Sequence, residues 1–171
     1  EPSGADVVVI NTCGFIDSAK EEAIDTILSV AQLKAEGQVQ KLLVTGCLTQ
    51  RYQQEILTEL PEVDGIMGTG SYGEIVSALA ELMSGGRPCR FADIHGMLDE
   101  FDRVLTTPKH YAYLRIAEGC DNRCAYCVIP SLRGRYRSRP MEKVLAEARR
   151  LADAGVKECI VIAQDITRYG I

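Results

Sequence analysis

The sequence lacks the features that mark several broad classes of protein. It has no run of about 18 apolar residues, so no membrane-spanning helix is expected. Its start, EPSGADVVVI, lacks a basic segment followed by an apolar one, so no secretion signal is recognised and a cytoplasmic location is expected. No repeat or low-complexity segment is present. With 46% hydrophobic and 25% charged residues, the composition predicts an ordinary globular protein.

Excess positive charge and an initiator methionine are also missing. The net charge of −5 gives no sign of general affinity for nucleic acids. The chain begins almost inside one apolar strand and ends on another, so we expect a fragment of a longer protein, inactive by itself. Seven cysteines are present, and without a secretion signal they favour metal or redox chemistry over a disulfide framework.

Apolar runs and helical periods alternate along residues 1–86. Residues 7–10 and 41–47 predict buried parallel strands, and a third strand is predicted in DGIMGTG. Capping-box patterns, Ser18 with Glu21 and Ser71 with Glu74, precede two of the three predicted helices. The expected apolar faces of these two helices are Ile24, Ile27, Leu28 and Ala31, and Ile75, Val76, Leu79, Leu82 and Met83. This order predicts an α/β layer with a parallel sheet.

A second unit is predicted over residues 110–171, after a linker at 87–109 that holds at most one short strand. An alternating strand at 111–117 is followed by a cysteine loop, a helix from Pro140 to Gly155, and a buried strand at 158–163. Such a start is compatible with a barrel or with an open sheet.

The cysteine loop places Cys120, Cys124 and Cys127 within eight residues, in RIAEGCDNRCAYCVIP. Structural zinc sites use four protein ligands, and neither His95 nor His110 lies at a finger-like spacing from the three cysteines. A cubane iron-sulfur cluster held by three cysteines would leave one iron open to a substrate or cofactor. The spacing alone leaves two alternatives, a zinc site completed from elsewhere and a chance cluster of buried cysteines.

Cys13 and Cys47 each end a predicted parallel strand, and each lies beside a glycine. Ligands of open parallel sheets bind outside the carboxyl ends of the strands, and neighbouring strands lie about 4.8 Å apart. We therefore expect both thiols to face one crevice; the alternative is two small buried residues at strand ends. Cys89 matches no ligand spacing and Cys159 lies in an apolar strand as expected core filler, so both are left out of the candidate sites.

Four arginines, Arg133, Arg135, Arg137 and Arg139, recur at every second position after the loop. If this stretch is extended, all four point to one side and form a positive face. That face could bind a carboxylate, moderate the charge of a cluster, or attract an acidic or phosphate-bearing acceptor. The alternative is a solvated surface.

The trio with Tyr126, in EGCDNRCAYCVIPSLRGRYRSRP, resembles the signature of the radical S-adenosylmethionine (SAM) enzymes and, more closely, their methylthiotransferase branch. NTCGFIDSAKEEAID and LLVTGCLTQRY are similar to the amino-terminal domain of that branch, in which three cysteines hold a second 4Fe-4S cluster. The resemblance implies an amino-terminal parallel-sheet α/β domain, followed by the first βα units of a partial TIM-type radical SAM barrel. It implies that Cys13 and Cys47 are two of the three ligands, with the third on an earlier strand.

The resemblance also implies the chemistry. The 4Fe-4S cluster at the trio would bind SAM through its open iron and cleave it to a 5′-deoxyadenosyl radical, and a flavodoxin or ferredoxin would supply the electron. Tyr126, Gln164 and Asp165 are candidate contacts of SAM; the last two end a predicted strand, where a polar strand-to-loop transition is the alternative.

Two stretches of the sequence imply which molecule accepts the methylthio group. CDNRCAYCVIPSLRGRYRSRP and AQDITRYG resemble the subfamily that methylthiolates the β-carbon of an aspartate in small-subunit ribosomal protein twelve. Two alternative functions stay open at this point. One is the same chemistry on a tRNA adenosine, and the other is an iron-sulfur binding or electron-carrier module that does not cleave SAM.

Overall fold

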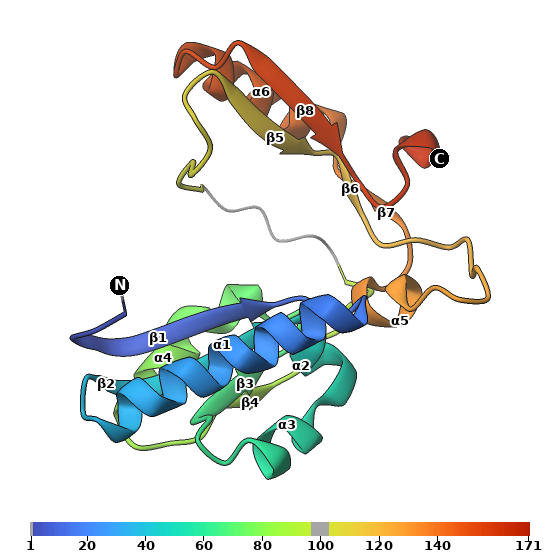
Figure 1. Ribbon diagram of the computed structural model, residues 1–171. Helices are drawn as coiled ribbons and strands as arrows, with labels where there is room; N and C mark the ends of the chain where they lie inside the picture. The colour runs from blue at the N-terminus through green and yellow to red at the C-terminus, as the bar shows by residue number, and fades with distance from the viewer. Residues whose placement is uncertain (1, 97–102) are drawn as a thin grey trace. The chain divides into compact units, whose positions relative to one another are not determined.

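The computed structural model describes residues 2–96 and 103–171, which belong to two compact units (Figure 1). The first unit extends to Ile94 and the second begins at His95, so the boundary lies inside the segment 87–109. Residues 97–102 of that segment lie outside the described part. None of the described helices is long and apolar enough to cross a membrane.

The first unit is built on a sheet of parallel strands in the order β1-β2-β3-β4. Their bounds are β1 (Ala5–Thr12), β2 (Val39–Gly46), β3 (Gly65–Met67) and β4 (Cys89–Arg90). The expected parallel α/β layer is confirmed. β4 comes from the segment interpreted as a linker, but it pairs with β3 and so completes the sheet of the first unit.

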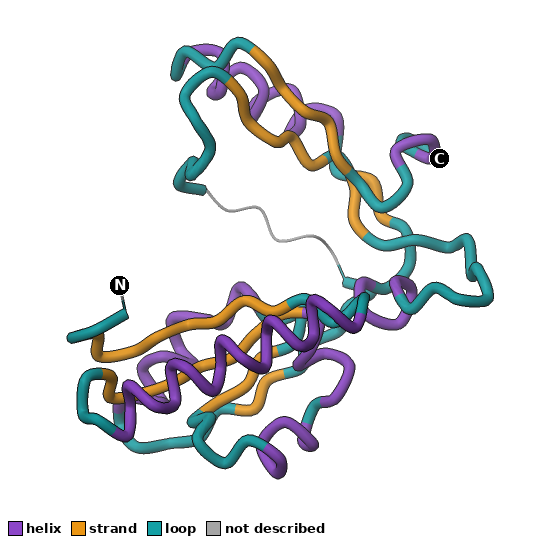
Figure 2. Tube along the Cα trace, in the orientation of Figure 1, coloured by secondary structure: helices purple, strands orange, loops and turns teal. Residues whose placement is uncertain are grey.

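Helices cover both faces of this sheet (Figure 2). They are α1 (Asp17–Ala35), α2 (Cys47–Tyr52), α3 (Gln54–Glu59) and α4 (Ile75–Met83), with a 3-10 turn η1 (Tyr72–Glu74) before α4. Successive strand side chains point to opposite faces. Leu42 therefore packs in the cluster that contains Ile27 of α1, whereas Leu43 packs with Leu82 of α4. Burial on both faces explains why β2 is a continuous apolar run.

Four expectations about the first unit were wrong in detail. Residues 7–10 are not fully buried, and Val9 is 40% exposed. The reason is that, among the described residues, β1 is an edge strand paired with β2 alone.

The helix faces and helix starts also differ from the expected ones. The buried face of α1 is rotated from the expected face, so that Ile24 and Leu28 are exposed. In α4, Val76 is exposed as well. Neither capping box forms, because neither helix start has a side-chain cap. The residues that α1 does bury are Ala23, Ile27, Val30 and Ala31.

The second unit pairs β5 (Tyr111–Arg115) with β8 (Glu158–Ile162) in parallel, and α6 (Met141–Asp153) packs against β5. Its core contains Ala112, Leu114, Val144 and Leu151. β6 (Ala117–Glu118) and β7 (Arg137–Ser138) form a short antiparallel pair. The loop that carries the three cysteines leads from β6 to α5 (Ile129–Arg133), and η2 (Ile166–Arg168) follows β8.

β8 is not the buried strand that the sequence predicts. Val161 is 47% exposed, and Cys159, expected to fill the core, is exposed. The reason is that the described part of this sheet has two strands, and its buried cluster gathers side chains of β5 and α6.

The two-sided packing of the first sheet generates a stability prediction. Replacing Ile27, which is fully buried between α1 and the sheet, with alanine removes three carbons and leaves a cavity. We expect Ile27→Ala to lower the free energy of unfolding by about 2–5 kcal/mol in urea titrations. Val76→Ala, at a position that is 76% exposed, should change it by less than about 0.5 kcal/mol. Equal effects of the two substitutions would contradict the helix faces described above.

Asp64, after α3, generates a pH prediction. Its carboxylate accepts from Lys34 Nζ at 2.5 Å, from Lys41 Nζ at 3.3 Å and from the amide of Leu42 at 2.8 Å. Burial raises the pKa of this carboxyl, but the hydrogen bonds and the two ammonium charges together lower the pKa by more than burial raises it. The pKa of Asp64 therefore lies below its ordinary value.

A pKa that is lower in the folded state stabilises the fold above the unfolded value of about 3.9, and this stabilisation is lost as the pH falls through the folded value. We therefore expect Asp64→Asn to lower the free energy of unfolding at pH 7, and the difference from the parent chain to shrink below about pH 4. Urea unfolding across that pH range measures it, with the exposed Glu22→Gln as the control. A deficit that is independent of pH would contradict the assignment.

Candidate functional site

Cys13 and Cys47 lie together at the carboxyl edge of the first sheet. The β1–β2 register pairs Thr12 with Gly46, and each cysteine is the residue that directly follows one member of this pair. A Cβ added to Gly14 would lie 2.8 Å from the Cys47 carbonyl oxygen, which shows how closely the two backbones approach. Cys13 is exposed and Cys47 is buried. The structure therefore brings these two residues to one edge, while their role as metal ligands stays a prediction.

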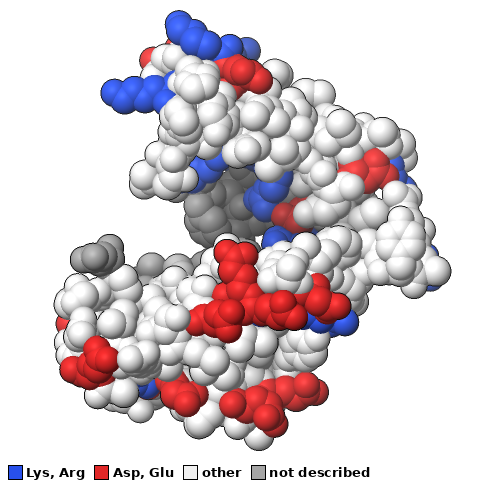
Figure 3. All heavy atoms as spheres, in the orientation of Figure 1, with Lys and Arg blue, Asp and Glu red and all other residues white. Residues whose placement is uncertain are grey.

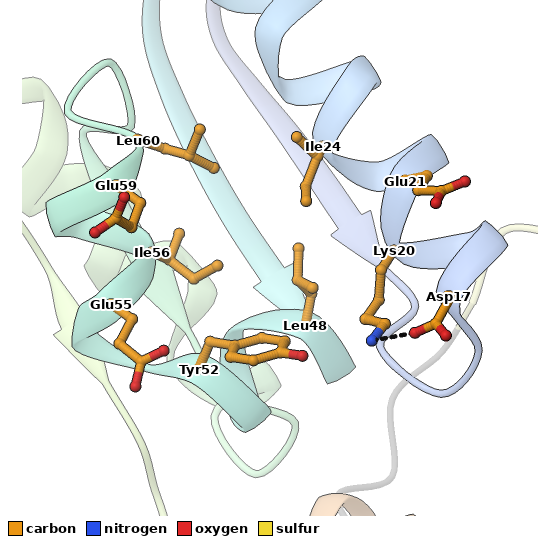
Figure 4. A pocket seen from close by; sticks show the side chains of 10 residues that line it. All are labelled: Asp17, Lys20, Glu21, Ile24, Leu48, Tyr52, Glu55, Ile56, Glu59 and Leu60. Atoms are coloured by element: carbon orange, nitrogen blue, oxygen red, sulfur yellow. Dashed lines mark ion pairs between the residues drawn. The ribbon is translucent and has the colours of Figure 1, made fainter.

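An apolar groove in the same unit runs between α1 and the α2–α3 pair (Figure 4). Leu48, Ile56 and Leu60 face Ile24 across it. Acidic side chains gather on this face of the unit (Figure 3). The groove lining contains neither Cys13 nor Cys47, so it is separate from the cysteine edge. The polar residues that complete the lining are Asp17, Lys20, Glu21, Tyr52, Glu55 and Glu59.

The three-cysteine loop of the second unit has a fixed beginning and an open middle. Cys120 is buried, and its amide donates to the Gly134 carbonyl at 3.2 Å. Cys124 is exposed and Cys127 is half-buried, and a turn joins them in which the Cys127 amide donates to the Cys124 carbonyl at 2.9 Å. Tyr126, a candidate contact of SAM, is 88% exposed.

The donor set fits an iron-sulfur cluster in its chemistry. All three thiols are free and come from one loop, and thiolates are the ligands of such clusters. Residues 2–96 and 103–171 contain no group of three or more His, Cys, Asp or Glu side chains already close enough to hold a metal ion. The loop therefore supplies the ligand types, and the convergence of the three thiols is not formed in this conformation.

Glu118, two residues before the first cysteine, is a buried carboxylate that the sequence reasoning missed. It is 6% exposed and lies 2.7 Å from Arg115 Nη1 and 3.6 Å from Arg133 Nη1. Its Oε1 also accepts a hydrogen bond from Gln164 Nε2 at 2.9 Å. Acidic residues are rarely buried without partners, so a glutamate in the apolar stretch before Gly119 was the signal that could have revealed it.

Gln164 and Asp165, which follow β8, both contact the cysteine loop. Gln164 Oε1 accepts from the amide of Gly119 at 2.9 Å. Asp165 accepts from Asn122 Nδ2 at 3.0 Å and from the Thr167 hydroxyl at 2.6 Å. The hydrogen bonds from Thr167 and Asn122 lower the pKa of the Asp165 carboxyl. The structure therefore brings these two candidates to the loop.

Asp121 connects the cysteine loop to Tyr136 and Arg168. Its Oδ1 accepts from the amide of Tyr136 at 3.1 Å, and its Oδ2 lies 3.7 Å from Arg168 Nη2. The Arg168 guanidinium also lies over the Tyr136 ring, at 5.7 Å from its centroid. Burial raises the pKa of the Tyr136 hydroxyl. No sequence pattern connects these three residues, because their contacts depend on how β7 and η2 fold back toward the loop.

The four alternating arginines do not form one positive face, so that expectation was wrong. Arg133 ends α5, and Gly134 then turns the chain with a φ of 75°, so the stretch is not extended. The helix was signalled by Pro130 near its start. Arg137 donates to the carbonyls of Arg135 at 2.7 Å and of Arg133 at 3.2 Å.

Arg139 is instead a core residue. It is 6% exposed, and its Nη1 lies 2.6 Å from Glu147 Oε2 and 2.5 Å from the Arg115 carbonyl oxygen. Glu147, on α6, also accepts from Arg103 Nε at 2.9 Å. This arginine joins α6 to β5, and its charge is paired with the Glu147 carboxylate inside the protein.

Comparison with known proteins divides the chain in the same way. Residues 1–68 match the model of an uncharacterised protein family, UPF0004, and residues 114–169 match the model of the radical SAM superfamily.

Relatives that match nearly the whole of this chain indicate a narrower family. "Ribosomal protein uS12 methylthiotransferase RimO" of Clostridioides difficile is 53% identical over 167 residues, which cover 97% of this chain and 38% of the relative. The protein of the same name from Pelotomaculum thermopropionicum is 52% identical over 98% of the chain. The chain belongs to the radical SAM methylthiotransferase family. It spans less than two fifths of the length of these family members.

A solved structure supports the fold of this family member. The radical SAM methyltransferase TsrM of Kitasatospora setae superposes with a TM-score of 0.63 at 13% identity, over 96% of this chain and 38% of that protein. At this identity the likeness concerns the fold alone. Together with the radical SAM match and the parallel β5–β8 pair, it confirms the expected beginning of a radical SAM barrel.

The backbone before Cys120 generates a prediction. Gly119 has a φ of 81°, and a Cβ there would lie 2.1 Å from the Arg135 carbonyl oxygen. We expect Gly119→Ala to lower the free energy of unfolding by about 1–3 kcal/mol or more. Gly155 has a φ of 91° with open space around it, so Gly155→Ala carries the backbone strain without the clash and should cost less. Chemical unfolding of the two variants measures this, and an equal loss would contradict the close packing.

Proposed function

We propose that the protein carrying this chain attaches a methylthio group to the β-carbon of an aspartate in ribosomal protein uS12. One observation carries the proposal. A C-x3-C-x2-C loop follows the first strand of a radical SAM fold, in a chain that is 51–53% identical to five proteins named as uS12 methylthiotransferases.

The proposed ligands of the catalytic 4Fe-4S cluster are Cys120, Cys124 and Cys127. Cys120 would supply the ligand whose backbone is already fixed, and the exposed Cys124 would supply one that closes over the cluster. A cluster and SAM, when bound, would supply the carbon-centred radical that can remove hydrogen from an sp3 carbon whose C–H no neighbouring group acidifies strongly. Ionisable side chains cannot do this, so the chain contributes position and the exclusion of water.

The other residues have proposed roles of their own. Cys13 and Cys47 would hold a second 4Fe-4S cluster at the sheet edge, with a third ligand from elsewhere in the protein, because two thiols hold a cubane cluster poorly. Tyr126 is exposed beside the trio and is proposed to contact SAM. Gln164 and Asp165 are proposed to shape the SAM site, since both reach the cysteine loop from the end of β8.

Partners and location follow from the proposed reaction. The substrate would be the small-subunit ribosomal protein, and a flavodoxin or ferredoxin would supply electrons. Ribosomal proteins are reached in the cytoplasm, where we place the reaction. The named relatives favour the ribosomal protein over a tRNA adenosine as the acceptor.

The cysteines give the direct test. After anaerobic reconstitution of the intact protein, we expect replacement of the trio by alanine to abolish SAM cleavage and to remove about four irons per chain. Replacing Cys13 and Cys47 should leave 5′-deoxyadenosine formation and abolish the mass increase of uS12. Iron assay, chromatography of the nucleoside and mass spectrometry of uS12 measure these results.

Two further cysteines serve as matched controls. Cys159→Ala and Cys89→Ala, at exposed thiols outside both candidate sites, should change neither iron content nor activity. Bound iron and sulfide without any 5′-deoxyadenosine would show a binding or electron-carrier module instead. Modified tRNA nucleosides with unmodified uS12 would assign the tRNA acceptor.

A further inference from the structure

The amide of Gly119, immediately before the first cysteine of the trio, is held by a side chain from far along the sequence. Gln164 Oε1 accepts from it at 2.9 Å, across 45 positions of chain. Because Gly119 is tightly packed against the Arg135 carbonyl, the backbone there cannot move toward that side. The next amide, that of Cys120, donates to the Gly134 carbonyl. The backbone that presents the first thiol is therefore fixed from two directions.

The orientation of the Gln164 amide depends on Glu118. A glutamine amide has a donating end and an accepting end, and it can serve Gly119 only when the oxygen faces that N–H. A carboxylate accepts and cannot donate, so Glu118 Oε1 binds the NH2 end of Gln164 at 2.9 Å and turns the other end toward Gly119.

Burial of the Glu118 charge is compensated locally. Arg115 and Arg133 both lie within 4 Å of its carboxylate, and they come from β5 and α5, on either side of the cysteine loop. Both guanidinium groups stabilise this carboxylate in its buried position, where its Oε1 accepts from Gln164 Nε2.

We propose that Glu118 and Gln164 are positioning residues of the cysteine loop, which fix the backbone at Gly119 and Cys120 so that the loop closes on a cluster with its first ligand already in place. The proposal rests on the proposed function for the trio as a cluster site, and it adds two residues that do not bind the cluster themselves.

The first experiment measures the backbone without any cluster. In cluster-free intact protein, hydrogen-deuterium exchange at the Gly119 amide should become about fivefold faster in Gln164→Met, which keeps the size of the side chain and removes both hydrogen bonds. Gln164→Glu should act in the same direction, because it sets a second carboxylate against Glu118. Gln164 is exposed, so neither change opens a core cavity. The control is Gln32→Ala on the exposed side of α1.

The second experiment measures the cluster after anaerobic reconstitution. We expect Gln164→Met and Glu118→Gln to release iron from the trio to a chelator roughly 10-fold to 100-fold faster, as is usual when a residue that supports metal ligands is lost. They should also alter the electron paramagnetic resonance spectrum of the reduced cluster. Glu142→Gln, an exposed carboxylate on α6, is the matched control for Glu118→Gln.

The outcomes separate this proposal from the proposed function. Exchange and iron release at parental values in Gln164→Met and Gln164→Glu would overturn the positioning role. A parent protein without a cluster at the trio would overturn the proposed function, while the exchange measurement would still decide whether Gln164 fixes Gly119. Faster exchange in the Gln164 variants with an unchanged thermal midpoint would support positioning over a general loss of stability.

Discussion

The second unit depends on how the buried charge of Glu118 is accommodated. A carboxylate removed from water costs several kcal/mol unless it is paired and hydrogen-bonded. The chain meets this cost with guanidinium groups from β5 and α5 and with the Gln164 amide from the end of β8. A neighbouring residue, Arg115, and two residues that lie further along the sequence, Arg133 and Gln164, thereby meet at the residue that precedes the cysteine loop. Misplacing any of them would remove one partner of this buried carboxylate, so the attachment of the loop is coupled to the fold.

The first unit places its cysteines by a different means, the register of parallel strands. Backbone pairing of Thr12 with Gly46 places the carboxyl ends of β1 and β2 at one edge of the sheet, and no charged side chain is needed for this. Apolar packing on both faces of β2 holds that register, since a slip of one residue would exchange Leu42 and Leu43 between the two faces. The two candidate sites therefore depend on separate forces, hydrophobic packing in one unit and a polar network in the other.

Much of this arrangement could be predicted from the sequence, because it depends on local patterns. The apolar run of β2, the cysteine spacing and the strand ends at Cys13 and Cys47 need only neighbouring residues. The faces of α1 could not be fixed in the same way, since Ile24 and Ala23 are both apolar and tertiary packing chose Ala23. The contact between Glu118 and Gln164 could not be predicted in this way, because 46 positions separate the two residues. The alternating arginines misled because a spacing of two has meaning only in an extended chain.

The contrast within the cysteine loop bears on how a cluster could be acquired. Every described polar contact at Gly119, Cys120 and Asp121 goes to residues outside the loop, whereas the Cys127 amide bonds only within it. A loop held at one end loses less conformational entropy on closing than a free one, because part of its backbone is already ordered. The Cys124 thiol is exposed, so under the proposed function it would be accessible to iron and sulfide. The fold thus orders the backbone at Cys120, and under the proposed function Cys124 and Cys127 would converge with it when a cluster is assembled.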